Sequence, residues 1–449
     1  MLFGHPVVHV APIVYPPVDP IALIVYVLLL TVVALLTMQR PAYGLCALIL
    51  TEPFAFYHAA FATTLTLPKI AVLGVLLGLW THPNAFATLA TRASWRILTA
   101  GLLVLAATLL SYAHALHHAP VIRESLKIVE YLLLFCAVTA AYRLDPDRRL
   151  VRTAFVCAAL LVSLLALGEE LTGAPSGLWI NGHVVPRIAG PLEGPNQLAG
   201  YLDVALPVTM ALAMWQPGTL TWIALFFISF ADFLTFSRGG LIGGSVAAAI
   251  VLYVVRRNVW ITLRPLIAGV LAGILVDTAW ALQLHLGGAR GAVAAFRLDL
   301  EDTESSYGGG VGTRSELWHA AITLWKSHKI FGIGAGNFEL EIPLTGLHGV
   351  KTHANSLYLQ ALVEGGIPLF AATLWLTYVS IATFIRDRLE SPFVAGAMAA
   401  SAALMLHQII DFLTFFPKVG GEWWIVLSLA CAELAIAARV PQTGRYACA

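Results

Sequence analysis

The chain has 449 residues, of which 59% are hydrophobic and 11% are charged, and its formal net charge is +1. A soluble globular protein cannot bury this much apolar surface, so lipid must be the solvent for much of the chain. The nearly balanced charge gives no indication of nucleic acid or of an acidic partner.

The apolar segments predict an all-α polytopic membrane protein. We expect twelve membrane-spanning helices, with thirteen as the alternative. The uncertain segment is 42–58, which Pro41, Glu52 and Pro53 flank or interrupt, so that it would be re-entrant or a half-helix. The start of the chain lacks the basic region of a signal peptide, so we expect residues 21–37 to be a retained span. The candidate segments are 21–38, 42–58, 66–81, 97–113, 124–142, 151–168, 198–214, 219–236, 240–256, 260–279, 357–385, 393–413 and 422–438.

Basic residues in the short loops predict the orientation, because such residues are concentrated on the cytoplasmic side. Alternate loops carry most of them, and the chain then ends in the cytoplasm. The loops on the opposite, external side carry few basic residues. The cytoplasmic set is Arg40, Arg92, Arg96, Arg143, Arg148, Arg149, Arg152, Arg256, Arg257, Arg264, Arg386, Arg388, Arg439 and Arg445, and the external set is Arg123, Arg187, Arg238 and Lys418.

A long segment, 282–352, falls on the external side. It divides the chain into N-terminal transmembrane helices over 1–281, an external loop over 282–352, and C-terminal transmembrane helices over 353–449. Within the loop, the spacing of apolar residues predicts an amphipathic helix over 313–329, with Thr313 and Glu316 as a capping box. The apolar face would hold Leu317, Ala320, Ala321, Leu324 and Trp325.

Ionisable residues inside the predicted spans lie mostly in their outer halves. A charge at the centre of a bilayer costs at least about 2.5–3.5 kcal/mol, so such residues indicate function or pairing. Lys127 is predicted to pair with Glu130, and His407 and Asp411 to share a helix face and bond to a neighbour. The shared depth predicts a polar cavity open to the outside. The residues are Lys69, Lys127, Glu130, Asp203, Asp232, Glu364 and Asp411, with Glu433 as the inner exception.

Three external arginines predict a binding site for phosphate, because the guanidinium fork makes bidentate, permanently charged contacts. Arg187 precedes the turn that contains Asn196, Arg238 precedes Gly239 and Gly240, and Arg314 opens the predicted amphipathic helix. The alternative for each is an interfacial anchor. We expect the fold to bring them together, with the two glycines letting backbone and ligand approach closely.

His353 is the candidate general base, since an imidazole accepts a proton near neutral pH. Asn355, two residues later, is expected either to orient a substrate or to cap the following helix. The glycine-rich run 332–338 lacks the Lys-Ser/Thr of a nucleotide-binding loop, so it predicts a turn, with amides near a phosphate as one option. The sequence shows no metal-ligand cluster, so we expect no metal, nucleotide or other cofactor.

Several short motifs together resemble the O-antigen ligase superfamily, which also contains O-antigen polymerases and some protein O-oligosaccharyltransferases. The resemblance covers residues 185–415 and is carried by the order and spacing of the motifs around one external loop. The motifs are Arg187-x-x-Gly with Pro195-Asn196, Thr235-x-Ser-Arg-Gly, Thr313-Arg-x-Glu-Leu-Trp, Gly332-x-Gly-x-Gly-x-Phe, and His353-Ala-Asn-Ser followed by Glu364-Gly-Gly-Ile-Pro.

The resemblance implies an enzyme of the bacterial inner membrane whose active site faces the periplasm. It would transfer a glycan from undecaprenyl diphosphate to a sugar hydroxyl of lipid A–core, without a metal and with inversion of the anomeric centre. His353 would be the general base, and the diphosphate and substrates would be bound by Arg187, Arg238, Arg314, Asn196 and Asn355. O-antigen polymerase and protein O-oligosaccharyltransferase are the alternatives within the superfamily, and a lipid or glycan transporter is the alternative outside it.

Overall fold

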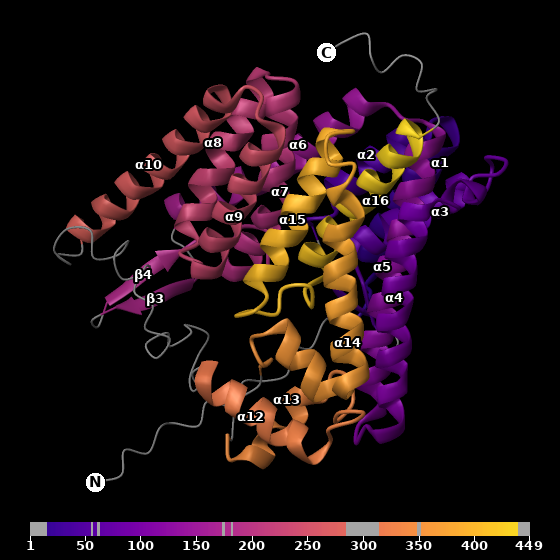
Figure 1. The fold of residues 1–449 in the computed structure, drawn as a ribbon, viewed down its shortest axis with the longest axis vertical. Coiled ribbons are helices and arrows are strands. Elements are labelled where there is room, and N and C mark those ends of the chain that lie inside the picture. The colour runs from indigo at the N-terminus through magenta and orange to yellow at the C-terminus, as the bar shows by residue number, and fades with distance from the viewer. Residues whose placement is uncertain are drawn as a thin grey trace.

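The computed structural model describes residues 16–54, 57–60, 63–172, 176–180, 183–283, 314–347 and 352–438. These residues form a bundle of helices with two small antiparallel hairpins (Figure 1). The elements are α1 (Pro20–Gln39), α2 (Pro41–Thr51), β1 (His58–Ala60), β2 (Thr63–Leu65), α3 (Leu67–Leu79), η1 (Phe86–Leu89), α4 (Arg92–Leu110), η2 (Ser111–His114), α5 (His118–Leu144), α6 (Arg148–Thr172), β3 (Ser176–Ile180), β4 (His183–Arg187), α7 (Pro195–Trp215), α8 (Thr219–Leu234), α9 (Arg238–Val255), α10 (Val259–Gln283), α12 (Arg314–Ser327), α13 (Phe338–Glu341), η3 (Ile342–Thr345), α14 (Leu357–Ile385), α15 (Pro392–His407) and α16 (Pro417–Ala437).

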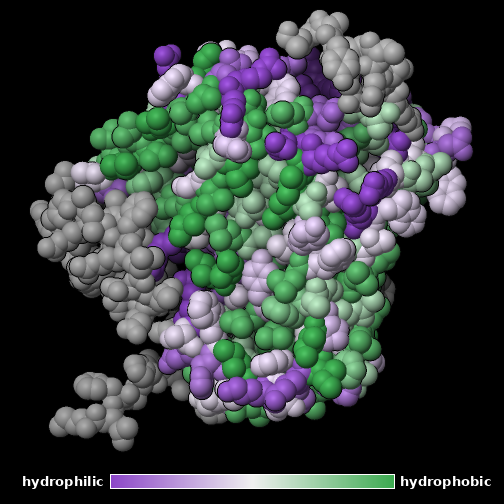
Figure 2. All heavy atoms as spheres, in the orientation of Figure 1, coloured by the Kyte–Doolittle hydropathy of each residue, from purple (hydrophilic) through white to green (hydrophobic). Residues whose placement is uncertain are grey.

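The helices confirm a multi-pass membrane protein that is mainly α-helical. Among the described residues, nine helices have the length and hydropathy to cross a bilayer, and α2, α3, α8 and α15 are shorter apolar helices. Figure 2 shows a broad hydrophobic surface over the helices, with hydrophilic side chains gathered at the upper and lower edges. The doubtful segment 42–58 is helical only in α2, whose 11 residues reach about 16 Å, roughly half the hydrocarbon thickness. The number of crossings and the division of the chain at 281 and 352 stay predictions.

The centre of the bundle is built from α7, α15 and α16, whose side chains are buried almost throughout. By contrast, α1 and α10 expose most of their apolar residues, as helices facing lipid do. Hydroxyl or carboxylate side chains cap many of the helices: Asp19 accepts from the first turn of α1, Ser356 from that of α14 and Ser391 from that of α15.

The two hairpins were not expected from the sequence. In the second, β3 pairs with β4 so that Ser176 faces Arg187. Strands of three to five residues contain too few alternations to be distinguished from loops by their pattern. This hairpin is relevant to function because Arg187 is its last residue.

Beyond one end of the bundle, α12 and α13 form a small external unit beside the start of α14 (Figure 1). The predicted apolar face of α12 is confirmed, since Leu317, Ala320, Ala321 and Leu324 are buried in a core of their own with Phe338. The described helix covers Arg314–Ser327 within the predicted 313–329. Thr313 lies outside the described residues, so the capping box stays a prediction.

The glycine-rich run beside α14 forms the predicted turn, with a specific mechanical role. Pro368 has no N–H to donate to the carbonyl of Glu364 four residues earlier, and α14 kinks at Gly366, where φ is 63°. The freed carbonyl accepts instead from Gly334 N at 2.8 Å, and that of Val363 accepts from Ile333 N at 3.0 Å. These two amides are therefore engaged by α14 and are not available to a phosphate.

The glycines of this run are required by both conformation and space. Gly332, Gly334 and Gly336 all have positive φ. A Cβ on Gly332 would lie 2.3 Å from the carbonyl oxygen of Glu364, a distance at which backbone must move. The run thus locks the external unit onto the kink of α14, close to the histidine that precedes this helix.

Candidate active site

The fold brings the three predicted arginines into one cluster. Arg187 ends β4, Arg238 begins α9, and Arg314 begins α12. Arg187 donates from Nε to the Thr235 carbonyl at 2.6 Å and from Nη2 to Asn196 Oδ1 at 2.7 Å. Burial, together with the charges of Arg314 and Arg238, lowers the pKa of Arg187 to about 10. Arg187 remains charged at neutral pH, in an electropositive environment with an affinity for anions.

Asp411 joins these groups and was not predicted as a site residue. Its Oδ2 accepts from Asn196 Nδ2 at 2.8 Å and lies 4.0 Å from Nη2 of Arg314. The apolar run 393–413 predicted Asp411 within a helix, but α15 ends at His407 and Asp411 lies in the loop before α16. The predicted bond from Asp411 to a neighbouring helix is confirmed, since Asn196 belongs to α7.

Some hydrogen-bond donors of the cluster have no acceptor in the described part of the chain. Arg314 lies beside the Asp411 carboxylate, and the positive charges of Arg314 and Arg238 both act on Arg187. Arg314 Nε is buried and has no hydrogen-bond partner within the described part of the chain. The same is true of Trp318 Nε1, one turn later on α12. Both are donors without an acceptor. The N-termini of α7, α9 and α12 add their partial positive charge around the same residues.

His353 lies beside the loop between α15 and α16, where its ring contacts residues that follow Asp411. Its ring centroid lies 4.0 Å from that of Phe415 and 5.4 Å from that of Phe412, the residue after Asp411. The adjacent backbone is fixed, because Ala354 N donates to Gln360 Oε1 at 2.7 Å. Burial lowers the pKa of His353 to about 4, against the opposing charge of Glu124. The imidazole is therefore neutral and able to accept a proton throughout the physiological range.

Asn355 does not cap α14, which was one of the two roles expected for it. Ser356, and not Asn355, is the N-cap of α14, since its Oγ accepts from Leu359 N at 3.4 Å. The capping alternative for Asn355 is therefore wrong. Asn355 has a φ of 47°, a left-handed conformation that asparagine adopts more readily than most residues. Its contact with a substrate stays a prediction.

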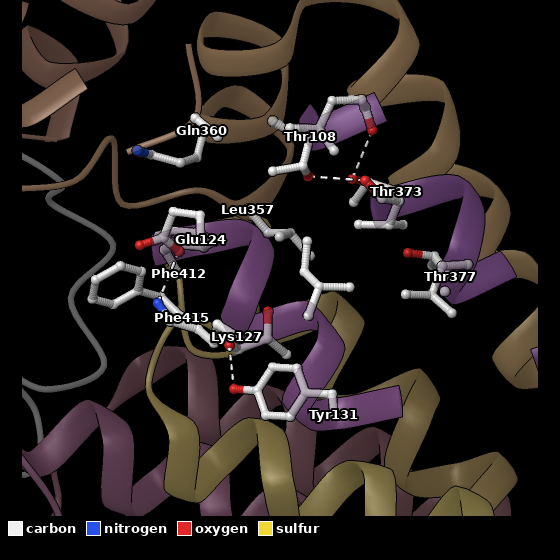
Figure 3. A pocket seen from close by; sticks show the side chains of 18 of the residues that line it. Thr108, Glu124, Lys127, Tyr131, Leu357, Gln360, Thr373, Thr377, Phe412 and Phe415 are labelled. Carbon is white, nitrogen blue, oxygen red and sulfur yellow. Dashed lines mark hydrogen bonds and ion pairs between the residues drawn. The ribbon is translucent and has the colours of Figure 1, made fainter. Parts of the chain in front are cut away.

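A mainly apolar cavity of about 140 Å³ adjoins the histidine. Figure 3 shows Glu124, Lys127 and Gln360 on one side of it and Thr373 and Thr377 on the other. Lys127 pairs with Glu124 at 2.8 Å, so the predicted partner Glu130 is wrong; Glu130 pairs with Lys69. The cavity shares one wall with the hollow around His353, formed by Glu124, Gln360, Glu364, Phe412 and Phe415. The ionisable side chains that line this mainly apolar cavity lie at the end that it shares with the hollow around His353.

In the part of the chain that the structure describes, no group of three or more His, Cys, Asp or Glu side chains is arranged to hold a metal ion. The charged groups that could bind a substrate are therefore the arginine cluster, defined here as Arg187, Arg238 and Arg314, and the ionisable groups beside His353.

Comparison with known protein families found one match. Residues 223–374 match the family model described as O-antigen ligase, a range that contains Arg238, Arg314 and His353. No curated protein matches the chain. Residues 223–374 are thus similar to the O-antigen ligase family, whose members include ligases and polymerases.

Proposed function

We propose that the protein transfers a glycan from undecaprenyl diphosphate to a sugar hydroxyl of lipid A–core on the periplasmic face of the inner membrane. The observation that carries this proposal is the neutral, partly buried His353 beside a loop whose Asp411 contacts Arg314 and Asn196, the partner of Arg187. A lipid diphosphate supplies the anion that the cluster can bind, and a sugar hydroxyl supplies the proton that the base can accept.

In the proposed reaction, His353 accepts the proton of the acceptor hydroxyl as its oxygen attacks the anomeric carbon of the donor. A new C–O bond forms while the bond between that carbon and the diphosphate breaks, and the diphosphate leaves with the bonding electrons. The arginine cluster stabilises the negative charge that grows on the leaving group. Attack on the face opposite the diphosphate inverts the anomeric centre. The proton on His353 is afterwards released to solvent.

The apolar cavity supports a lipid substrate. Its aliphatic and aromatic lining joins the hollow of His353 at Glu124 and Gln360, so a hydrocarbon chain in the cavity would bring its polar head to the base. Ligase and polymerase use the same donor and differ in the acceptor, so both are consistent with this geometry. A transporter would move the same lipid without forming a covalent product.

Purified full-length protein, incubated with lipid-linked O-antigen, lipid A–core, a chelator and no nucleotide, should produce a ladder of higher-mass lipopolysaccharide on a gel. That ladder is the expected result, because neither a metal nor a nucleotide takes part in the proposed chemistry. A lengthened donor chain would instead identify a polymerase. Movement of the donor across proteoliposomes without any covalent product would reject the enzyme and favour transport.

The rate of transfer should stay constant from about pH 8 down to about pH 5 and fall only near pH 4. His353 has a lowered pKa, so it remains an unprotonated base well below the usual 6.5 of histidine. The same shift affects stability: between pH 6.5 and 4 the unfolded chain binds more protons than the folded one, so the free energy of unfolding decreases as the pH falls through this window. A pH–rate profile at saturating substrates tests this, and a half-maximal rate at pH 6.5 would contradict it.

A further inference from the structure

A buried hydrogen-bonded chain lies directly below the arginine cluster and has no part in the chemistry above. Nδ1 of His407, at the end of α15, lies 2.7 Å from Oδ2 of Asp203 in the middle of α7. Its Nε2 lies 3.3 Å from Oγ of Ser237, the N-cap of α9. All three residues are buried. The prediction that His407 bonds to a neighbouring helix is confirmed.

The hydrogen-bond network assigns the protons of this chain. The Asp203 carboxylate only accepts, so Nδ1–H of His407 donates to it, which fixes the tautomer and the plane of the ring. Nε2 of the neutral ring then accepts from the Ser237 hydroxyl, whose oxygen also accepts from Gly240 N at 3.3 Å. Asp203, His407 and Ser237 therefore form a directed relay.

The glycines after Arg238 create the space for this relay and do not approach a ligand. A Cβ on Gly239 would lie 2.1 Å from Cδ2 of His407, and a Cβ on Gly243 would lie 2.9 Å from Oδ1 of Asp203. The expectation that Gly239 and Gly240 admit a ligand is therefore corrected: Gly239 admits the imidazole and Gly240 packs on Ala199.

The relay ends at a strained turn that supports two of the arginines. Phe236, between α8 and α9, has a φ of 48°, which costs an aromatic residue on the order of 1–3 kcal/mol. On one side of Phe236, the Thr235 carbonyl accepts from Arg187 Nε at 2.6 Å. On the other side, Ser237 directly precedes Arg238. The position of both guanidinium groups thus depends on this turn.

We propose that Asp203, His407 and Ser237 are positioning residues that hold the turn 235–237 and so aim Arg187 and Arg238 at the diphosphate of the donor. This inference rests on the proposed function. It assigns the relay a role in binding the donor and none in proton transfer to the acceptor.

Ser237→Ala should raise the KM for the lipid-linked donor about tenfold, the equivalent of one weakened charge-assisted hydrogen bond, with kcat and the acceptor KM nearly unchanged. Ser391→Ala is the matched control: Ser391 is an equally buried N-cap, on α15, and accepts from Val394 N at 3.4 Å. Both variants lose an N-cap hydrogen bond that contributes about 1 kcal/mol to stability, but only Ser237 belongs to the relay. Ser237→Thr, which keeps the hydroxyl, should restore the donor KM.

His407→Gln should give the same donor defect, and adding Ser237→Ala to it should increase the defect little further, because both changes break one chain. Equal donor KM values for Ser237→Ala and Ser391→Ala would overturn the relay. Calorimetric binding of inorganic pyrophosphate to the full-length protein separates the two proposals. If the wild type binds pyrophosphate but forms no transfer product, the proposed function fails, and the pyrophosphate affinities of Ser237→Ala and Ser391→Ala still test the relay. If the wild type does not bind pyrophosphate, both proposals fail.

Discussion

Replacing His353 by alanine is expected to reduce glycan transfer by about 10²–10⁴-fold, the range for loss of a general base. The imidazole packs against Phe412 and Phe415, where its lowered pKa keeps it neutral. Without it, the acceptor hydroxyl would have to lose its proton to water during the attack. The donor KM should change little, since the guanidinium groups that hold the diphosphate are intact. The measurement is the initial rate of transfer by purified protein at saturating donor and acceptor.

His328→Ala provides the control for this experiment. His328 also belongs to the external unit, but its ring lies against the Leu324 carbonyl at 3.4 Å, at the end of α12. This variant should transfer at the wild-type rate and insert into the membrane equally well. Full activity of His353→Ala would reject its assignment as the base.

Replacing Arg187 by lysine, which keeps the charge, is expected to raise the donor KM about 10- to 100-fold. An ammonium group cannot make the planar contacts that Arg187 makes with both the Thr235 carbonyl and Asn196 Oδ1. Each hydrogen bond of a charged group contributes roughly 1.5–3 kcal/mol, and 1.4 kcal/mol corresponds to a factor of ten. Donor titration at a fixed acceptor concentration measures the change.

Arg256→Lys is the matched control, because Arg256 is exposed and its Nε donates to the nearby Tyr253 carbonyl. Its donor KM should equal that of the wild type. If the donor KM of Arg187→Lys also equals that of the wild type, the site does not require a guanidinium group at this position. Arg187 would then be a simple interfacial anchor.

Much of this site could be predicted from charge asymmetry along the chain. Arginines on the predicted external side oppose the usual distribution of basic residues, so Arg187 and Arg238 can be singled out from the sequence. The apolar face of α12 was equally readable, because helical periodicity over four turns is a strong signal. His353 emerged from its place at the start of a long span and from family resemblance.

Other features depend on contacts between distant segments and leave no local signal. Asp411 sits in an apolar run that hides the end of α15, and its partner Asn196 is 215 residues away in the chain. The pairing of His407 with Asp203 spans 204 residues. The glycine-rich run could be recognised as a turn, but its partner, the kink at Gly366, is set by Pro368 acting on another element. Such pairings are decided by how the helices pack.

The central claim is that donor binding and proton acceptance belong to separate groups that adjoin the loop between α15 and α16. Pyrophosphate binding to His353→Ala and Arg187→Ala, measured side by side with their transfer rates, tests this most directly. The account predicts that His353→Ala binds pyrophosphate as the wild type does while failing to transfer, and that Arg187→Ala binds it at least about tenfold more weakly. Normal binding by Arg187→Ala, or lost binding by His353→Ala, would contradict it.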